Sequence, residues 1–183
     1  MIIAIFPIGA PGSGKTTLKE YLKTRLPNFY STERDYEFSL LRKNNSLKIT
    51  RRLLFDQLEK FIEEIISINQ KNYKNTYYVY FDSSNAKILG RERLYKKLNP
   101  EKIIEINFQF PKQLLLDRVK QREHLTFPIN HIKQDEIITK ISKNIEFSNS
   151  KDNRITKIYM SKSIDVKELG NLIICCYNIP FLS

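Results

Sequence analysis

The most constraining feature of this chain is a cluster of glycines close to its first residues. Three of the five glycines, Gly9, Gly12 and Gly14, fall within six residues, and Lys15 and Thr16 follow directly. Together they match the pattern GxxxxGK[ST]. Glycines let backbone N–H groups surround a polyphosphate, because no side chain stands in the way. The pattern predicts a phosphate-binding loop that consists of Gly9, Ala10, Pro11, Gly12, Ser13, Gly14, Lys15, Thr16 and Thr17.

The residues around this loop fit the same interpretation. An apolar run at 2–8 has the length of a strand, and 16–25 has the apolar spacing of a helix. Strand, glycine loop and helix is the order that a P-loop, or Walker A motif, requires. In such a loop Lys15 reaches the β- and γ-phosphates, and the Thr16 hydroxyl binds Mg²⁺. We therefore expect ATP and Mg²⁺ as ligands, with the positive end of the helix adding to phosphate binding.

Strand and helix patterns alternate along the rest of the chain. This alternation predicts an α/β protein with the P-loop NTPase/kinase fold: one domain over 1–183, a central parallel sheet of about five strands, and helices on both faces. Ligands of such sheets bind at the carboxyl ends of the strands. The expected strands are 2–8, 28–32, 77–81, 102–108 and 154–160, and the expected helices are 16–25, 50–68, 87–98, one that begins near Pro111, 134–147 and 165–177.

Two aspartates follow expected strands and should therefore lie near the phosphate. Asp35 comes after the second strand and Asp82 ends the third. Transfer of a phosphoryl group to a hydroxyl needs a carboxylate that takes the proton. One aspartate is expected to act as this base, and the other to hold Mg²⁺ directly or through water. The alternative for each is a helix N-cap, and Asp82 precedes a helix.

A polar segment between two expected helices has the composition of a lid. The lid is predicted at about 122–134, and Arg118 and Arg122 lie four residues apart on the helix that leads into it. Such arginines can close on the transferring phosphate, while a lid keeps out water that would compete as acceptor. The alternative is that both arginines belong to a solvated helix edge.

Composition limits the class of protein and its partners. The chain carries a net charge of +11 with a pI near 9.6, which favours polyanionic partners, although abundant Lys, Ile and Asn can also reflect an AT-rich genome. No apolar run approaches the roughly 18 residues of a membrane span, and the first residues lack the features of a signal peptide. We expect an intracellular, cytoplasmic protein without a membrane partner. The cysteines Cys175 and Cys176 are expected to be reduced and buried in the last helix.

These motifs together resemble the phage-type polynucleotide 5′-kinases of the P-loop kinase superfamily, over about residues 1–140. The resemblance rests on the loop GAPGSGKT, the segment PNFYSTERD that ends at Asp35, the segment 82–85 (Asp-Ser-Ser-Asn) and the R-x-x-x-R spacing before the lid. It implies that Asp35 is the general base for a 5′-hydroxyl and that Arg122 contacts the donor phosphates. The family has an arginine three residues after the catalytic aspartate, whereas this chain has Phe38.

The leading functional hypothesis is therefore an ATP-dependent kinase that transfers the γ-phosphate to the 5′-hydroxyl end of a nucleic acid. Lys15, Asp35 and Arg122 are the expected catalytic residues, Arg118 is expected at the nucleotide, and Thr16 and Asp82 at the metal. The alternative within the same fold is a kinase of a nucleoside, nucleotide or sugar. A nucleotide switch or motor ATPase is a third hypothesis, but the chain has neither an Asn-Lys-x-Asp signature nor an Asp-Glu pair that closes a strand.

Overall fold

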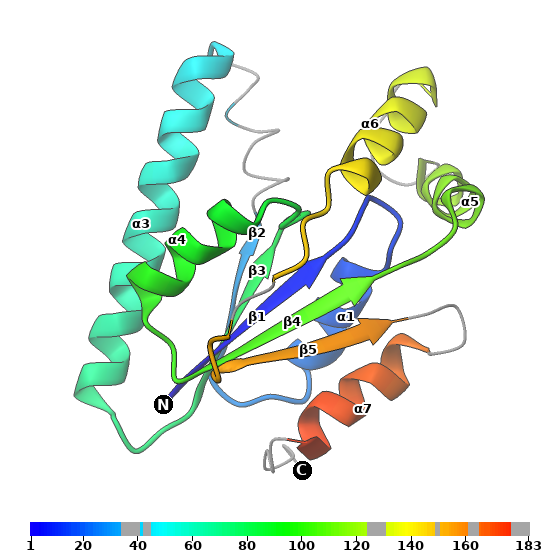
Figure 1. Cartoon of the computed structure of the whole chain (residues 1–183). Coiled ribbons are helices and arrows are strands. Elements are labelled where there is room, and N and C mark those ends of the chain that lie inside the picture. The colour runs from blue at the N-terminus through cyan, green and yellow to red at the C-terminus, as the bar shows by residue number, and fades with distance from the viewer. Residues whose placement is uncertain (34–40, 42–44, 124–130, 149–150, 161–164, 177–183) are drawn as a thin grey trace.

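The computed structural model describes residues 1–33, 41, 45–123, 131–148, 151–160 and 165–176. At its centre lies a sheet of five parallel strands in the order β2-β3-β1-β4-β5 (Figure 1). This confirms the α/β fold and the parallel sheet expected from the sequence. The strands are β1 (Ile2–Ile8), β2 (Phe29–Glu33), β3 (Tyr77–Asp82), β4 (Lys102–Phe108) and β5 (Ile155–Met160).

β1 and β3 are formed by almost unbroken apolar sequence, whereas β4 also contains Glu105 and Asn107. Every residue of β1 is buried, and all but one residue in each of β3 and β4 are buried as well. Continuous apolar runs are typical of parallel strands that are covered on both faces. Ile5 of β1 pairs with Tyr80 of β3 on one side and with Ile104 of β4 on the other. The first strand, which leads into the glycine loop, is therefore the middle of the core.

Helices cover both faces of the sheet (Figure 1). Leu22 of α1 and Ile173 of α7 belong to one buried cluster, and Ile62 of α3 and Tyr95 of α4 belong to another. Alternate residues of β1 contribute to both clusters, as the twofold period of a strand requires. The helices of the described part are α1 (Lys15–Lys23), α3 (Leu47–Lys71), α4 (Ile88–Leu98), α5 (Lys112–Glu123), α6 (His131–Lys143) and α7 (Val166–Cys176).

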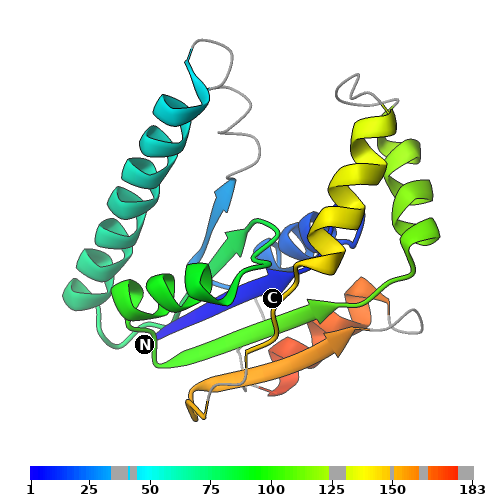
Figure 2. The same cartoon turned by 45° about the horizontal axis from the view of Figure 1, so that its top comes forward.

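Three helices extend past the carboxyl edge of the sheet, where all five strands end. The first turns of α3 stand beyond the tip of β2, and α5 and α6 lie side by side beyond β4 (Figures 1 and 2). Leu115 of α5 and Ile138 of α6 pack on Ala10 of the glycine loop. The chain leaves β1 toward one side of the sheet and leaves β3 toward the other, so this edge is a topological switch point, where ligands of open α/β sheets bind.

Several sequence expectations need correction. The long helix is 47–71 rather than 50–68, because Ser46 caps its first turn by accepting from the Ile49 N–H at 3.4 Å. The helix expected at 134–147 is α6, 131–143, so it occupies one end of the segment assigned to the lid. The middle of that segment, 124–130, lies outside the described residues. Cys175 is exposed rather than buried. No helix in the described ranges is long and apolar enough to cross a membrane.

Candidate active site

The glycine-rich segment makes a tight loop between the end of β1 and the start of α1. Its backbone is left-handed twice, with φ of +81° at Gly12 and +96° at Gly14, a conformation that L side chains rarely adopt. A Cβ atom on Gly12 would also stand 2.6 Å from the carbonyl oxygen of Leu115 in α5. The loop therefore keeps a bare backbone that is pressed against α5, which is the geometry needed for N–H groups to surround an anion.

Lys15 stretches its ammonium group across this loop. Its Nζ donates hydrogen bonds to the carbonyl oxygens of Gly9 at 3.0 Å and Ala10 at 2.9 Å, and to Ser13 Oγ at 3.3 Å. Helix α1 begins at the same lysine, so its positive N-terminal end is directed at the loop. A cation, a helix terminus and a bare backbone thus converge on one small region, an arrangement that suits a phosphate group.

A buried tyrosine holds the end of the loop by a hydrogen bond. The Tyr80 hydroxyl, on β3, donates a 2.6 Å hydrogen bond to the carbonyl oxygen of Lys15. Burial raises the pKa of Tyr80 well above its usual value, and the nearby charge of Asp82 raises it further. The hydroxyl therefore stays protonated and remains a donor. This contact fixes the first turn of α1 to the centre of the sheet.

Asn85 fastens the loop after β3 to the loop after β1. Its Nδ2 donates to the carbonyl oxygens of Pro7 at 2.9 Å and Phe81 at 2.8 Å, the next-to-last residues of the neighbouring strands β1 and β3. The Gly9 N–H donates to the carbonyl oxygen of Ser84 at 3.2 Å, which adds a second tie. The asparagine of the Asp-Ser-Ser-Asn segment thus has a structural role, because it holds the phosphate loop and the segment after β3 together.

Asp82 ends β3 beside the first helix. One carboxylate oxygen lies 3.2 Å from Lys19 Nζ, and Lys19 is itself buried on α1. The Asp82 N–H donates to Thr32 Oγ1 of β2 at 3.1 Å. Helix α4 has Lys87 as its N-cap residue, so Asp82 is not a helix cap. The sequence alternative of capping is therefore wrong for this residue, and its carboxylate lies at the carboxyl edge with its charge balanced by a lysine.

The residues expected to hold Mg²⁺ are compatible with it chemically. Thr16 is exposed at the start of α1, and Asp82 keeps 15% of its side chain exposed at the end of the adjacent strand. Hydroxyl and carboxylate oxygens are the hard ligands that Mg²⁺ takes, usually with waters and substrate phosphates completing the shell. In the described residues no three His, Cys, Asp or Glu side chains gather into a metal site. Such a site would therefore depend on the phosphates of the nucleotide.

A buried arginine connects this edge with the rest of the fold. Arg91 is 1% exposed, and its Nε donates at 2.8 Å to Glu105 Oε1, which also accepts from the Tyr95 hydroxyl at 2.6 Å. Its other nitrogens donate to the carbonyl oxygens of Asn85 at 2.5 Å and Glu146 at 2.8 Å. Arg91 thereby joins the loop after β3, the middle of β4 and the segment after α6.

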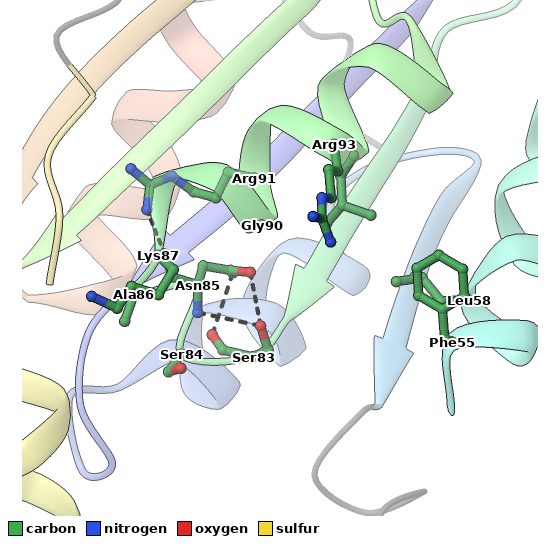
Figure 3. Close-up of a pocket in the computed structure, with 11 residues that line it drawn as sticks. Phe55, Leu58, Ser83, Ser84, Asn85, Ala86, Lys87, Gly90, Arg91 and Arg93 are labelled. Atoms are coloured by element: carbon green, nitrogen blue, oxygen red, sulfur yellow. Dashed lines mark hydrogen bonds between the residues drawn. The ribbon is translucent and has the colours of Figure 1, made fainter. Parts of the chain in front are cut away.

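A pocket of about 340 Å³ opens beside these residues, between α3 and the loop that leads from β3 into α4. Phe55 and Leu58 of α3 form one wall, and Ser83 and Ser84 lie on the opposite side (Figure 3). Arg93 of α4 points into the same space, whereas Arg91 points away from it (Figure 3). This pocket was missed from the sequence, since its walls come from segments that are well separated along the chain.

The other predicted site residues divide into two groups. Arg118 lies on α5, the helix that packs on the glycine loop. Its guanidinium carbon is 4.8 Å from the centre of the Phe110 ring, which is a cation–π contact. Arg122 lies in the last turn of α5, but its side chain is outside the described residues. Asp35 and Phe38 are outside them as well. The roles of Asp35, Arg118 and Arg122 therefore stay predictions.

Three residues of the site were missed from the sequence: Lys19, Tyr80 and Arg91. A signal existed only for Lys19, which lies one helical turn after Lys15 and so shares its side of α1. Tyr80 was assigned to a buried strand without a role for its hydroxyl. Arg91 lies in the helix expected at 87–98, and nothing in the local sequence shows that this charge is fully buried.

No family model matches this chain, and no curated protein matches its sequence. Solved structures do match it over nearly their whole length. A sugar kinase from Janibacter sp. HTCC2649 is 14% identical, with 97% of this chain and 94% of that chain covered and a TM-score of 0.63. A fungal RNA kinase is 18% identical, with 96% and 85% covered and a TM-score of 0.61. The tunicamycin resistance protein of Deinococcus radiodurans is 15% identical, with 100% and 99% covered and a TM-score of 0.55.

These likenesses establish that the chain has the fold of the P-loop kinases. The fold that the sequence motifs indicated is thus confirmed. The names of the neighbours include a sugar kinase and an RNA kinase, so the same fold accommodates very different phosphate acceptors.

Proposed function

We propose that this protein is an ATP-dependent kinase that transfers the γ-phosphate to the 5′-hydroxyl end of a nucleic acid. One observation carries the proposal: the phosphate loop and the pocket between α3 and α4 lie at the same carboxyl edge, joined by Asn85. The loop supplies a place for the donor phosphates, and the pocket supplies adjacent space for an acceptor. The kinases among the structural neighbours support phosphoryl transfer as the reaction class.

Each group of site residues has a separate role in the proposed phosphoryl transfer. The loop N–H groups and Lys15 bind and neutralise the donor phosphates, and Mg²⁺ at Thr16 and Asp82 would balance further negative charge. Asp35, two residues after β2, takes the proton from the acceptor hydroxyl as its oxygen attacks the γ-phosphorus. The bond from that phosphorus to the β,γ-bridging oxygen breaks, and ADP leaves. Arg118 and Arg122, at the lid, add positive charge to the transferred group.

The charge of the protein favours a nucleic acid as acceptor. A net charge of +11 attracts polyanions, and three basic residues occupy the first turns of α3 beside the pocket: Lys48, Arg51 and Arg52. The second candidate is a kinase of a small acceptor such as a nucleoside or a sugar. The pocket volume of about 340 Å³ supports it, because that space is at the lower end for small-molecule sites.

A panel of acceptors tests the proposal. The protein is incubated with ATP labelled in the γ-phosphate and with a 5′-hydroxyl oligonucleotide, the same oligonucleotide carrying a 5′-phosphate, a nucleoside or a hexose. We expect the 5′-hydroxyl oligonucleotide to be the preferred acceptor, the 5′-phosphorylated one to take no label, and the Lys15→Ala variant to transfer label on the order of 10³-fold more slowly than the parent. Label on the nucleoside or hexose instead would establish the small-molecule alternative. Release of free phosphate at the same rate with and without acceptor would contradict kinase activity.

A further inference from the structure

We infer that the pocket between α3 and α4 binds the terminal nucleobase of the acceptor strand, with Phe55 as its stacking surface, and that Arg51 and Arg93 bind the phosphates that follow. The inference rests on the proposed function and identifies the residues that would give that function its preference for a strand. None of these three residues belongs to the phosphate loop or to the expected catalytic set.

Phe55 is exposed in a way that packing within this fold does not explain. It is 53% exposed, although it lies three residues before the buried Leu58 and on the same side of α3. Both side chains line the pocket (Figure 3). An aromatic ring at the wall of an open pocket offers a flat apolar face, and a base stacked on such a ring contributes about 1–3 kcal/mol per base in proteins that bind single strands. That chemistry suits the π-face of a nucleobase better than a hexose.

The helical spacing puts a positive charge directly beside this ring. Arg51 is one turn before Phe55 on the same side of α3, in the first turns of that helix. Arg93, on α4, points into the pocket from the other side (Figure 3). Arg51 is exposed and so is Arg93. A ring flanked by two guanidinium groups fits one base with phosphates next to it, since arginine pairs well with phosphate oxygens.

Charge along α3 changes sign after Phe55. Its first nine residues, 47–55, include three basic side chains and no acidic one, whereas the remaining residues, 56–71, include four acidic and two basic ones. Only the half beside the pocket is therefore attractive to a polyanion. A neutral small acceptor would gain nothing from this distribution, but a nucleic acid strand would.

Steady-state kinetics with two acceptors test the stacking role. We expect Phe55→Ala to raise KM for a 5′-hydroxyl oligonucleotide and for the matching nucleoside by about tenfold, because both carry the base. Phe55→Trp should restore the parent value, since it keeps an aromatic face. Leu53→Ala is the matched control: Leu53 is also exposed on α3, but two residues away and on the opposite side. An unchanged KM for both acceptors in Phe55→Ala would overturn the inference.

The arginines are tested by the difference between the same two acceptors. Arg51→Ala and Arg93→Ala should each raise KM for the oligonucleotide about fivefold and leave KM for the nucleoside unchanged, because the nucleoside has no phosphates. Lys60→Ala is the control and should have little effect on either, since Lys60 is an exposed cation of the same helix but lies in its acidic half. If Arg51→Ala and Lys60→Ala raised KM for the oligonucleotide equally, the effect would come from the overall charge of the protein, and a specific phosphate site at Arg51 would be contradicted.

Direct binding separates this inference from the proposed function. Fluorescence anisotropy of a labelled trinucleotide with a free 5′-hydroxyl reports occupancy without any reaction. If the parent protein binds the probe and Phe55→Ala weakens binding about tenfold while no transfer is found, the pocket assignment holds and the proposed reaction fails. If transfer occurs normally and Phe55→Ala changes neither binding nor KM, the reaction holds and the pocket assignment fails. If the parent does not bind the probe, both fail.

Discussion

The two sides of the carboxyl edge to which we assign the phosphate donor and the acceptor, the donor side and the acceptor side, are built in opposite ways. The donor side is the backbone of one continuous segment, 9–14, completed by Lys15 at the start of α1. The acceptor side is a pocket of side chains from α3, α4 and the loop after β3, drawn from residues 55–94. A backbone site binds what all nucleotides share, their phosphates, while a pocket of side chains distinguishes one acceptor from another. This division is consistent with the two structural neighbours that are 14% and 18% identical to this chain, one named a sugar kinase and the other an RNA kinase.

The largest expected effect is on the donor side. Lys15→Ala should lower kcat on the order of 10³-fold, because its ammonium group stabilises charge that develops on the phosphates. The free energy of unfolding should stay close to the parent value, since the Nζ hydrogen bonds to Gly9, Ala10 and Ser13 stay within the loop. Turnover and urea unfolding measure the two quantities, with Lys23→Ala on the same helix as control. Near-normal turnover in a folded variant would remove the basis for a kinase.

Asp35→Asn tests which aspartate serves the acceptor. The substitution keeps the size of the side chain and removes its basicity, so kcat should fall on the order of 10²-fold with little change in ATP affinity. Turnover at saturating ATP and nucleotide binding are measured separately. Loss of ATP affinity with turnover preserved would show instead that Asp35 serves the metal or the fold, and Asp82 would become the candidate base.

Arg91→Met probes the buried connection that both sides share. The variant leaves Glu105 as a buried carboxylate without its cation and removes donors from two carbonyl oxygens. Breaking a buried ion pair costs about 3–5 kcal/mol, so the free energy of unfolding in urea should fall by about 3 kcal/mol or more. Arg93→Met, two residues along the same helix but exposed, should change it by less than about 0.5 kcal/mol. Equal losses in the free energy of unfolding for the two variants would show that the buried ion pair of Arg91 does not stabilise the fold.

Arg122→Ala should have a smaller effect, about tenfold on kcat, with a weaker effect on ATP affinity. A lid arginine acts mainly on charge in the transition state, and one such charge-assisted hydrogen bond is worth roughly 1.5–3 kcal/mol. Single-turnover rates and nucleotide binding are compared between the variant and its parent. Identical rates would assign Arg122 to the solvated helix edge, the alternative that the sequence left open.

The sequence predicted the structure around the phosphate loop well, because the information for it is local. The loop, the strand before it and the helix after it follow from residues 2–25, and the apolar runs of β1 and β3 indicate buried strands. The acceptor side could not be predicted in the same way. Phe55 belongs to an ordinary amphipathic helix, and its 53% exposure depends on what packs around α3, which no local pattern records.

Charged residues show the same limit. The sequence placed Asp82 at the correct edge, since strand ends follow from hydrophobic patterns. Its partner Lys19, 3.2 Å away, depends on how α1 packs against β3, which no local pattern records. Likewise the basic composition of α4 gave no reason to separate Arg91 from Arg93. One is fully buried and the other points into the pocket, although they are close neighbours on one helix (Figure 3).

The dependence of acceptor use on salt compares the two sides in a single experiment. Each phosphate that the acceptor side contacts releases counterions, by roughly 0.7 per phosphate for a single strand, whereas a nucleoside has no phosphate to bind. We predict that kcat/KM for a short 5′-hydroxyl oligonucleotide exceeds that for the matching nucleoside by more than about tenfold at about 50 mM salt, and that this advantage shrinks toward about 200 mM. Equal use of the two acceptors, with a flat response to salt for both, would contradict a nucleic acid acceptor.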